Sequence, residues 1–310
     1  MKFYPFCKGA IIGLLLAGVM AIASDKNVLQ FAKTMEQQFD VMIPERPVLY
    51  ESIRRTPQFP DNYNIFQPSV SPDATAIGWW SRPKPDRDEK IPFYWVKSLR
   101  EGIQPVWVEG RIPMGSHGIS SDGKVIVAVA RRYPIRDEPW QLLAIDRRSG
   151  TVVHDLTQYV TEVNIGSYLE LEDVNVAAAG NMVALGSNEE KIQVLEIPSG
   201  KTVYAGSGRF PRISPDGKRL AFVNKGMIWI HSLENGSDVK LLKGKNVKGI
   251  GHWSPDGRFL PAGAWTVPLA MEKRQIIVDT TTGKYSVIGK LGEGDYGDYI
   301  AWVSTKLLEQ

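Results

Sequence analysis

The sequence predicts an all-β protein folded as a six-bladed β-propeller, because one turn motif recurs along the chain between short apolar strands. Residues 214–217 read Ser-Pro-Asp-Gly, in which Pro215 presets φ, Asp216 can accept backbone hydrogen bonds and Gly217 tolerates positive φ. Related turns lie at residues 71–74, 121–123 and 254–257, a degenerate copy at 176–185 and a fragment at 301–307. A repeat of roughly 40–50 residues has room for four short strands, as in a propeller blade.

Each repeat is expected to supply four strands, and the fourth repeat shows them most clearly. Its strands are predicted at residues 210–214, 219–223, 227–231 and 240–242, ordered outward from the propeller axis. In four repeats a glycine marks the turn between the third and fourth strands: Gly150, Gly200, Gly236 and Gly283.

The sixth repeat is incomplete, since the sequence given stops at Gln310 with room for only two strands after the fifth repeat. An open propeller would expose unpaired strand edges. The apolar stretch at residues 47–53 is therefore expected to complete the sixth blade beside the C-terminal strands. Residues 46–310 then form one propeller domain.

The first 23 residues are predicted to be a secretory signal peptide. Lys2 and Lys8 precede an uncharged apolar run at residues 10–23, which ends in Ala-Ile-Ala. Cleavage there would place the protein in the periplasm or outside the cell, leave no transmembrane span and remove Cys7, the single cysteine of the sequence. The alternative is an uncleaved anchor, although a membrane span needs about 20 apolar residues.

Residues 24–45 are predicted to form one amphipathic helix ahead of the propeller. Their apolar side chains recur at steps of three and four, and Pro44 and Pro47 end the pattern. This helix either packs on the domain surface or serves as an arm that binds a partner.

The charge pattern gives no reason to expect a nucleic-acid partner. The formal net charge of +3 falls to +1 when Lys2 and Lys8 leave with the signal peptide, and the remaining charges are interspersed.

No catalytic signature is found in the sequence, and neither a cofactor nor a metal is expected. There is no Gly-x-Ser-x-Gly elbow, no His-Glu-x-x-His and no EF-hand loop. His117, Arg212 and His252 fall in innermost-strand stretches and are candidates to line the central channel. The two histidines are expected to hydrogen-bond to backbone near the axis, with metal binding as the alternative. Acidic residues at 170–173 and 293–298 read as solvated loops, with Ca²⁺ binding as the alternative.

Loop lengths predict which face of the propeller is used for recognition. Long connections at residues 82–92, 131–139 and 265–274 join second to third strands and would emerge opposite the short Ser-Pro-Asp-Gly turns. The connection at residues 291–298, between one repeat and the next, is expected to emerge on the same face. Six residues on or beside these segments are candidate binding residues: Arg87, Arg132, Tyr133, Arg136, Trp140 and Tyr296. The alternative is that these loops are tolerated insertions.

The repeated turn, the Leu-Ala-Phe strand at residues 220–222 and the Ile228-Trp229 pair resemble TolB-type, WD-repeat-like β-propeller repeats, over residues 66–307. The resemblance implies an exported, non-catalytic module of the periplasm or cell envelope that binds a protein or an envelope component. Such a protein would act as a monomer or as part of an envelope complex. A polysaccharide lyase or hydrolase with its site at the channel mouth is the alternative.

Overall fold

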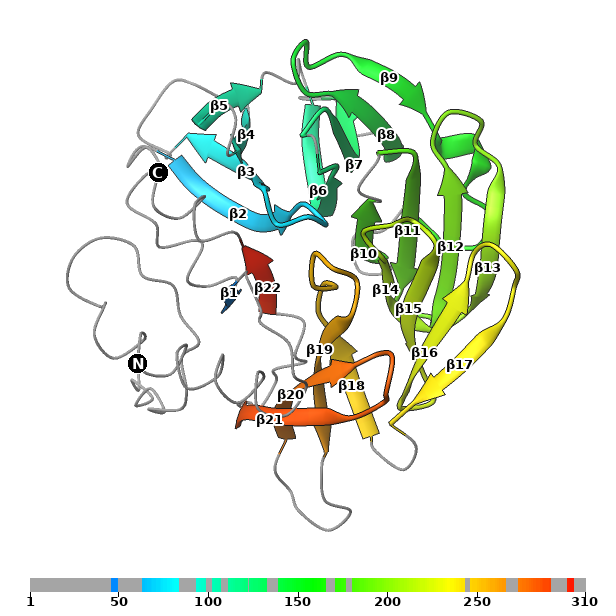
Figure 1. Ribbon diagram of the computed structural model, residues 1–310. Helices are drawn as coiled ribbons and strands as arrows, with labels where there is room; N and C mark the ends of the chain where they lie inside the picture. Colours follow the sequence, from blue (N-terminus) through cyan, green and yellow to red (C-terminus); the bar gives the residue numbers. More distant parts are fainter. Residues whose placement is uncertain are drawn as a thin grey trace, which may run out of the picture.

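Five four-stranded antiparallel sheets and one strand pair make up the described structure, a computed structural model. It describes residues 46–49, 63–83, 93–98, 102–106, 111–121, 123–132, 139–165, 171–176, 180–242, 246–265, 273–290 and 300–303. The five sheets follow one another around a common centre, which is bordered by the first strands of several sheets, such as β2, β6 and β10 (Figure 1). This is a propeller-like, all-β arrangement, as the sequence predicts.

The sheets are numbered I to V in chain order, and in each the strands pair in sequence order. Sheet I contains β2 (Tyr63–Val70), β3 (Ala76–Pro83), β4 (Phe93–Ser98) and β5 (Gly102–Val106). Sheet II contains β6 (Arg111–Ile119), β7 (Val125–Arg132), β8 (Gln141–Asp146) and β9 (Val152–Asp155), followed by the 3-10 turn η1 (Thr157–Tyr159). Sheet III contains β10 (Leu171–Val176), β11 (Met182–Ser187), β12 (Lys191–Glu196) and β13 (Thr202–Ser207).

Sheet IV contains β14 (Arg209–Ile213), β15 (Arg219–Asn224), β16 (Met227–Ser232) and β17 (Asp238–Leu241). Sheet V contains β18 (Asn246–Ile250), β19 (Phe259–Trp265), β20 (Lys273–Asp279) and β21 (Tyr285–Lys290). The four strands predicted for the fourth repeat are those of sheet IV, to within two residues at each end. The glycines predicted between third and fourth strands lie in those turns, with φ between 67° and 74°.

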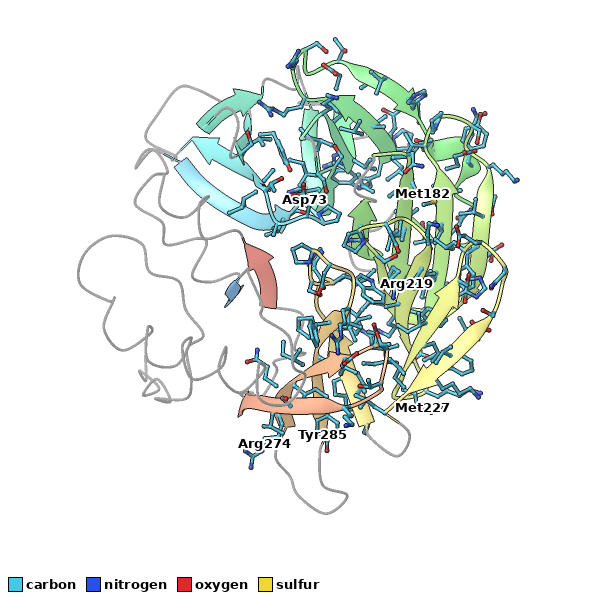
Figure 2. The ribbon with its side chains drawn as sticks, in the orientation of Figure 1. Asp73, Met182, Arg219, Met227, Arg274 and Tyr285 are labelled. Atoms are coloured by element: carbon cyan, nitrogen blue, oxygen red, sulfur yellow. The ribbon has the colours of Figure 1, made fainter. Side chains whose placement is uncertain are left out.

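The core of the described structure lies between consecutive sheets, because neighbouring sheets pack against each other face to face. One apolar cluster joins sheets II and III through residues such as Val127, Leu142 and Leu185, and another joins sheets IV and V. Further clusters join sheets I with II and III with IV. The side chains drawn in Figure 2 fill these spaces. Middle strands are therefore buried on both faces, whereas outer strands such as β13 and β17 are largely exposed.

The Ser-Pro-Asp-Gly turns are held by their own side chains. The Ser214 hydroxyl donates to Asp216, and Asp216 accepts a hydrogen bond of 3.1 Å from the backbone N–H of Lys218. Gly217 has a φ of 71°, the left-handed conformation that favours glycine. Residues 71–74 make the same turn with Ala74 at a φ of 61°.

The turn between the first two strands and the turn between the last two lie side by side at one end of each sheet. In sheet IV, Leu233 donates a backbone hydrogen bond of 2.8 Å to Lys218, and Lys218 forms an ion pair of 2.9 Å with Glu234. Equivalent backbone bonds tie these turns in sheets II, III and V. We call this end the turn face, and the opposite end, where second and third strands connect, the loop face.

The two ends of the described chain pair with each other. β1 (Arg46–Leu49) runs antiparallel to β22 (Ile300–Val303), with Arg46 opposite Val303 and Leu49 opposite Ile300. The pair lies in the sector between sheets V and I (Figure 1). The sequence predicts that the stretch at residues 47–53 lies beside the C-terminal strands, and the pairing of its first residues with β22 agrees with this. The rest of the expected sixth blade, the signal peptide and the helix at 24–45 lie outside the described residues.

No helix among the described residues is long and apolar enough to cross a membrane.

Candidate functional site

Polar side chains gather at one repeated position near the centre of the ring. We call it the central position. It lies two residues before the turn that joins the first and second strands of a sheet; in sheet IV, for example, the turn begins at Ser214 and the central position is Arg212. That turn is closed in the same way in sheets I, II, IV and V, by a hydrogen bond from its fourth residue back to its first. The central positions of sheets I to V are Ser69, Gly118, Asn175, Arg212 and His252.

Asn175 and His252 meet although they come from sheets that are not neighbours. Asn175 Nδ2 lies 3.4 Å from His252 Nδ1, and sheet IV stands between their sheets III and V. Asn175 Oδ1 also accepts a hydrogen bond of 2.8 Å from the backbone N–H of Ile213 in sheet IV. The side chain of Asn175, which is 4% exposed, therefore joins three sheets at the centre.

Arg212 places a positive charge in the same cluster. Its side chain is 4% exposed, and its Nη1 donates a hydrogen bond of 2.9 Å to the carbonyl oxygen of Pro211. The carbonyl oxygen of Arg212 accepts a hydrogen bond of 2.9 Å from Trp253 Nε1, which ties β14 to the segment that follows β18. Sheets IV and V are thus joined beside the charge.

The imidazole of His252 is neutral near pH 7 in this setting. Burial lowers the pKa of His252 well below its ordinary value of 6.5, and the charge of Arg212 lowers it further. The oxygen of Asn175 is occupied by the Ile213 N–H, so the amide nitrogen faces Nδ1 of His252. Nδ1 is then an acceptor, and this hydrogen-bond pattern assigns the ring proton to Nε2.

The structure brings together Arg212 and His252, two of the three predicted channel residues, and places His117 elsewhere. His117 lies on β6, immediately before Gly118, which holds the central position of sheet II. His117 is 4% exposed. Its Nε2 lies 3.3 Å from the carbonyl oxygen of Gly78, and its ring meets Tyr94 edge-on at 5.1 Å. A Cβ on Gly78 would overlap the Tyr94 hydroxyl, so glycine is required there. His117 thus packs between sheets I and II.

Sequence reasoning missed Asn175. Its repeat lacks the Ser-Pro-Asp part of the turn, with Ala179 in place of the aspartate, so the motif draws no attention to it. Asn175 lies five residues before Gly180, as Arg212 does before Gly217 and His252 before Gly257. An alignment of the repeats on these glycines therefore puts the three residues at equivalent positions.

Of the predicted loop-face residues, the structure describes the side chain of Trp140. It is partly buried against the core between sheets II and III, and the guanidinium of Arg131 lies 4.5 Å from its ring centroid. Arg132 ends β7, and its backbone pairs with Arg111. Arg87, Tyr133, Arg136 and Tyr296 lie outside the described residues.

The described residues contain no group of three His, Cys, Asp or Glu side chains that could hold a metal ion. His231 lies 2.9 Å from Asp238 at the outer side of sheet IV, and His154 lies on the outer strand β9. The acidic stretch at 293–298 is outside the described residues, as are the side chains of the stretch at 170–173.

No protein-family model matches the chain, and no curated protein matches it. Among solved structures, the fold is similar to that of "putative TolB from Agrobacterium tumefaciens", with a TM-score of 0.51 and 16% sequence identity. The match covers 77% of this chain and 90% of the other. At this identity the likeness concerns the fold alone, and it agrees with the five consecutive sheets: the chain has a TolB-like β-propeller fold.

Proposed function

We propose that this chain is an exported six-bladed β-propeller that binds a protein or cell-envelope component in the periplasm without catalysing a reaction. The β1–β22 pair, lying between sheets V and I, supports a sixth blade shared by the two ends of the chain. The similarity to a TolB structure supports the same fold class.

The observation that carries the proposal is the contrast between the two faces. On the turn face, backbone hydrogen bonds tie the short turns together in sheets II to V. On the loop face, second and third strands are separated by residues 84–92 in sheet I, 133–140 in sheet II and 266–272 in sheet V. In sheets III and IV the same connection takes three residues and two. Long loops on a rigid scaffold are a common means of recognition.

Trp140 supports a recognition role at the base of the sheet II loop. Its ring is anchored on the core and stacked under Arg131, so it is held in one place where the loop returns to β8. Rigid aromatic and arginine side chains are favoured anchors of protein interfaces. We place the binding surface on Trp140 with Arg87, Arg132, Tyr133, Arg136 and Tyr296.

Capture from a periplasmic extract, with identification by mass spectrometry, tests the proposal. A variant in which residues 84–92 and 133–138 are shortened to tight turns should lose the captured partner while keeping the melting temperature of the full chain. The matched control is Lys218→Ala with Glu234→Ala, which changes exposed side chains of the turn face. If the shortened, folded variant captures the partner as the full chain does, the loop face is not the binding surface. Product formation from a polysaccharide would favour the enzymatic alternative.

A further inference from the structure

The turn between β16 and β17 carries the single Asn-Gly pair of the sequence, Asn235 and Gly236. It lies on the turn face of sheet IV, and residues 234–240 are all exposed. The backbone N–H of Gly236 donates a hydrogen bond of 2.9 Å to the carbonyl oxygen of Ser232, which closes the turn. A Cβ added to Gly236 would meet nothing within 4 Å, so the space beside this backbone is open.

The side chain of Asn235 is folded back over the Gly236 backbone. Its Oδ1 accepts a hydrogen bond of 2.9 Å from the backbone N–H of Ser237, two residues further along the chain. This hydrogen bond closes a small ring that contains both Cγ of Asn235 and the backbone nitrogen of Gly236, so the two atoms are held near each other. Among the described residues, Nδ2 of Asn235 has no hydrogen-bond partner.

We propose that Asn235 is a site of spontaneous covalent modification, at which its amide reacts with the backbone nitrogen of Gly236. The nitrogen loses its proton and attacks Cγ, so a C–N bond forms and a cyclic imide results. The bond from Cγ to Nδ2 breaks, and the nitrogen leaves as ammonia with the proton that Gly236 gave up. Water then opens the imide at either carbonyl and yields aspartate or isoaspartate. No oxidant or reductant is needed.

The residue that follows each asparagine singles out Asn235. Asn181 and Asn246 are also exposed, but Met182 and Val247 follow them, and the side chains of these residues crowd the peptide nitrogen. Glycine has no side chain and leaves that nitrogen accessible. The reaction is therefore expected at Asn235 well before it is detected at the other two exposed asparagines.

The aspartates of the Ser-Pro-Asp-Gly turns show that the folded-back geometry needs an amide to react. Asp216 and Asp256 precede glycines, and each accepts a hydrogen bond from the backbone N–H two residues further on, as Asn235 does. A carboxylate resists attack by a nitrogen nucleophile, whereas an amide carbon accepts it. Asn235 combines the reactive group with the accessible nitrogen.

The hydrogen bond from Gly236 to Ser232 must open before the nitrogen attacks. The turn is exposed, and β17 behind it is an outer strand that is largely exposed as well. Opening at such a place leaves the core between the sheets intact, because exposed turns open locally without global unfolding. The reaction therefore proceeds in the folded chain.

The modification changes the turn face of sheet IV. It puts a carboxylate beside Glu234, which forms an ion pair of 2.9 Å with Lys218. Isoaspartate also lengthens the backbone between Ser232 and Gly236, so the hydrogen bond that closes the turn loses its geometry. The long connections lie on the opposite face, so partner capture by the loop face should not change. The modification and the proposed function can thus fail independently.

The test is incubation of the folded full chain at mildly alkaline pH, followed by peptide mass spectrometry. The peptide with Asn235 should gain the mass difference between an NH₂ and an OH group, and isoaspartate should account for part of the product. Enzymatic methylation of the isoaspartyl carboxyl group detects that part. Peptides with Asn181 and Asn246 from the same digest are internal controls.

Two variants separate the reacting groups. Asn235→Gln keeps an amide but would have to close a larger ring, so the mass gain at this position should be lost. Gly236→Ala places a methyl group beside the nitrogen and should slow the reaction severalfold. The melting temperature of each variant shows that the chain is folded during the incubation.

Two results would overturn the inference, and both come from the wild-type chain, so neither needs a variant to fold. One is no mass gain at Asn235 in the folded chain while the chain unfolded in urea reacts, which would mean that the bond to Ser232 protects the turn. The other is equal mass gain at Asn235, Asn181 and Asn246, which would remove any special role of Gly236.

Discussion

Arg219 of sheet IV donates a hydrogen bond of 2.8 Å from Nη2 to the carbonyl oxygen of Gly257, the turn glycine of sheet V. The relationship is repeated between the neighbouring sheets from II to V. The residue two positions after the turn glycine lies against the turn glycine of the next sheet, as Val125 lies against Gly180 and Met182 against Gly217. Met182 and Arg219 are labelled in Figure 2 at the starts of β11 and β15. Each turn therefore also forms part of a contact between neighbouring sheets.

Arg219→Ala should destabilise the fold by about 1–2 kcal/mol. The change removes the hydrogen bond to Gly257 and the stacking of the guanidinium over Trp253, at 4.8 Å from the ring centroid. Urea unfolding measures the effect. The neighbouring Lys218→Ala is the control, because its ion pair with Glu234 is exposed and should contribute far less. Equal effects of the two changes would contradict the proposed contact.

Gly257→Ala should cost more than Gly236→Ala, although both glycines have a positive φ, of 68° and 74°. At Gly236 an added Cβ meets nothing within 4 Å, so the cost is backbone strain alone, about 1–2 kcal/mol. At Gly257 the Cβ would come within 2.8 Å of Arg219 Nη2 and displace it. Thermal unfolding of both variants gives the difference. If the Gly257→Ala and Gly236→Ala variants are equally stable, displacing Arg219 does not lower the free energy of unfolding, which contradicts the prediction.

The stability of the fold should rise with pH in a way that depends on His252. Its pKa is lowered in the folded chain, by burial first and by Arg212 second. Between that lowered pKa and the ordinary value of 6.5, the unfolded chain binds a proton that the folded chain does not, so the free energy of unfolding increases with pH through this window and then levels off. His252→Gln should flatten this slope, measured by urea unfolding at several pH values. His154→Gln, on the outer strand β9, is the control. Identical slopes for wild type and His252→Gln would refute this account.

Asp279→Ala should destabilise the fold strongly, by about 3 kcal/mol, because it breaks a pair in which the carboxylate is fully buried. Arg258 Nη2 lies 2.8 Å from Asp279, and the backbone N–H of Thr281 donates a hydrogen bond of 2.9 Å to it. Burial would raise the pKa of Asp279, but these hydrogen bonds outweigh it and hold the pKa below its ordinary value. Asp146, at the same place in sheet II, bonds to Ser149 near the surface, and Asp146→Ala should cost much less. Chemical denaturation compares the two.

Removal of residues 298–310 should cause aggregation or a large drop in melting temperature. It deletes β22 and leaves β1 without the partner described here, so strand edges are exposed. Deletion of residues 46–49 should have the same consequence, because it removes the other half of the pair. Size-exclusion chromatography and thermal melting report the outcome. A truncated chain that melts as the full chain does would exclude closure through this pair.

The sequence determined the local units of this fold. The Ser-Pro-Asp-Gly turn carries its own hydrogen bonds, from the Ser214 hydroxyl to Asp216 and from the Lys218 N–H to Asp216, and Gly217 accepts its φ at no cost. The strands of sheet IV and the short and long connections between second and third strands could be placed for the same reason. These features depend on residues that are close in sequence, so the order and spacing of the residue types are enough to predict the turn and the strands beside it. The expected binding residues Arg87, Tyr133, Arg136 and Tyr296 and the signal peptide stay predictions.

Only the tertiary structure decided which polar residues meet at the centre. Asn175 and His252 are 77 residues apart, and no local pattern brings them together. His117 lies on β6, whereas His252 lies two residues beyond the end of β18, and relative to the following turn the two positions differ by one residue. His117 packs on Tyr94, while His252 reaches Asn175. Such contacts arise when several sheets converge, which is a property of the assembled sheets and not of any one repeat.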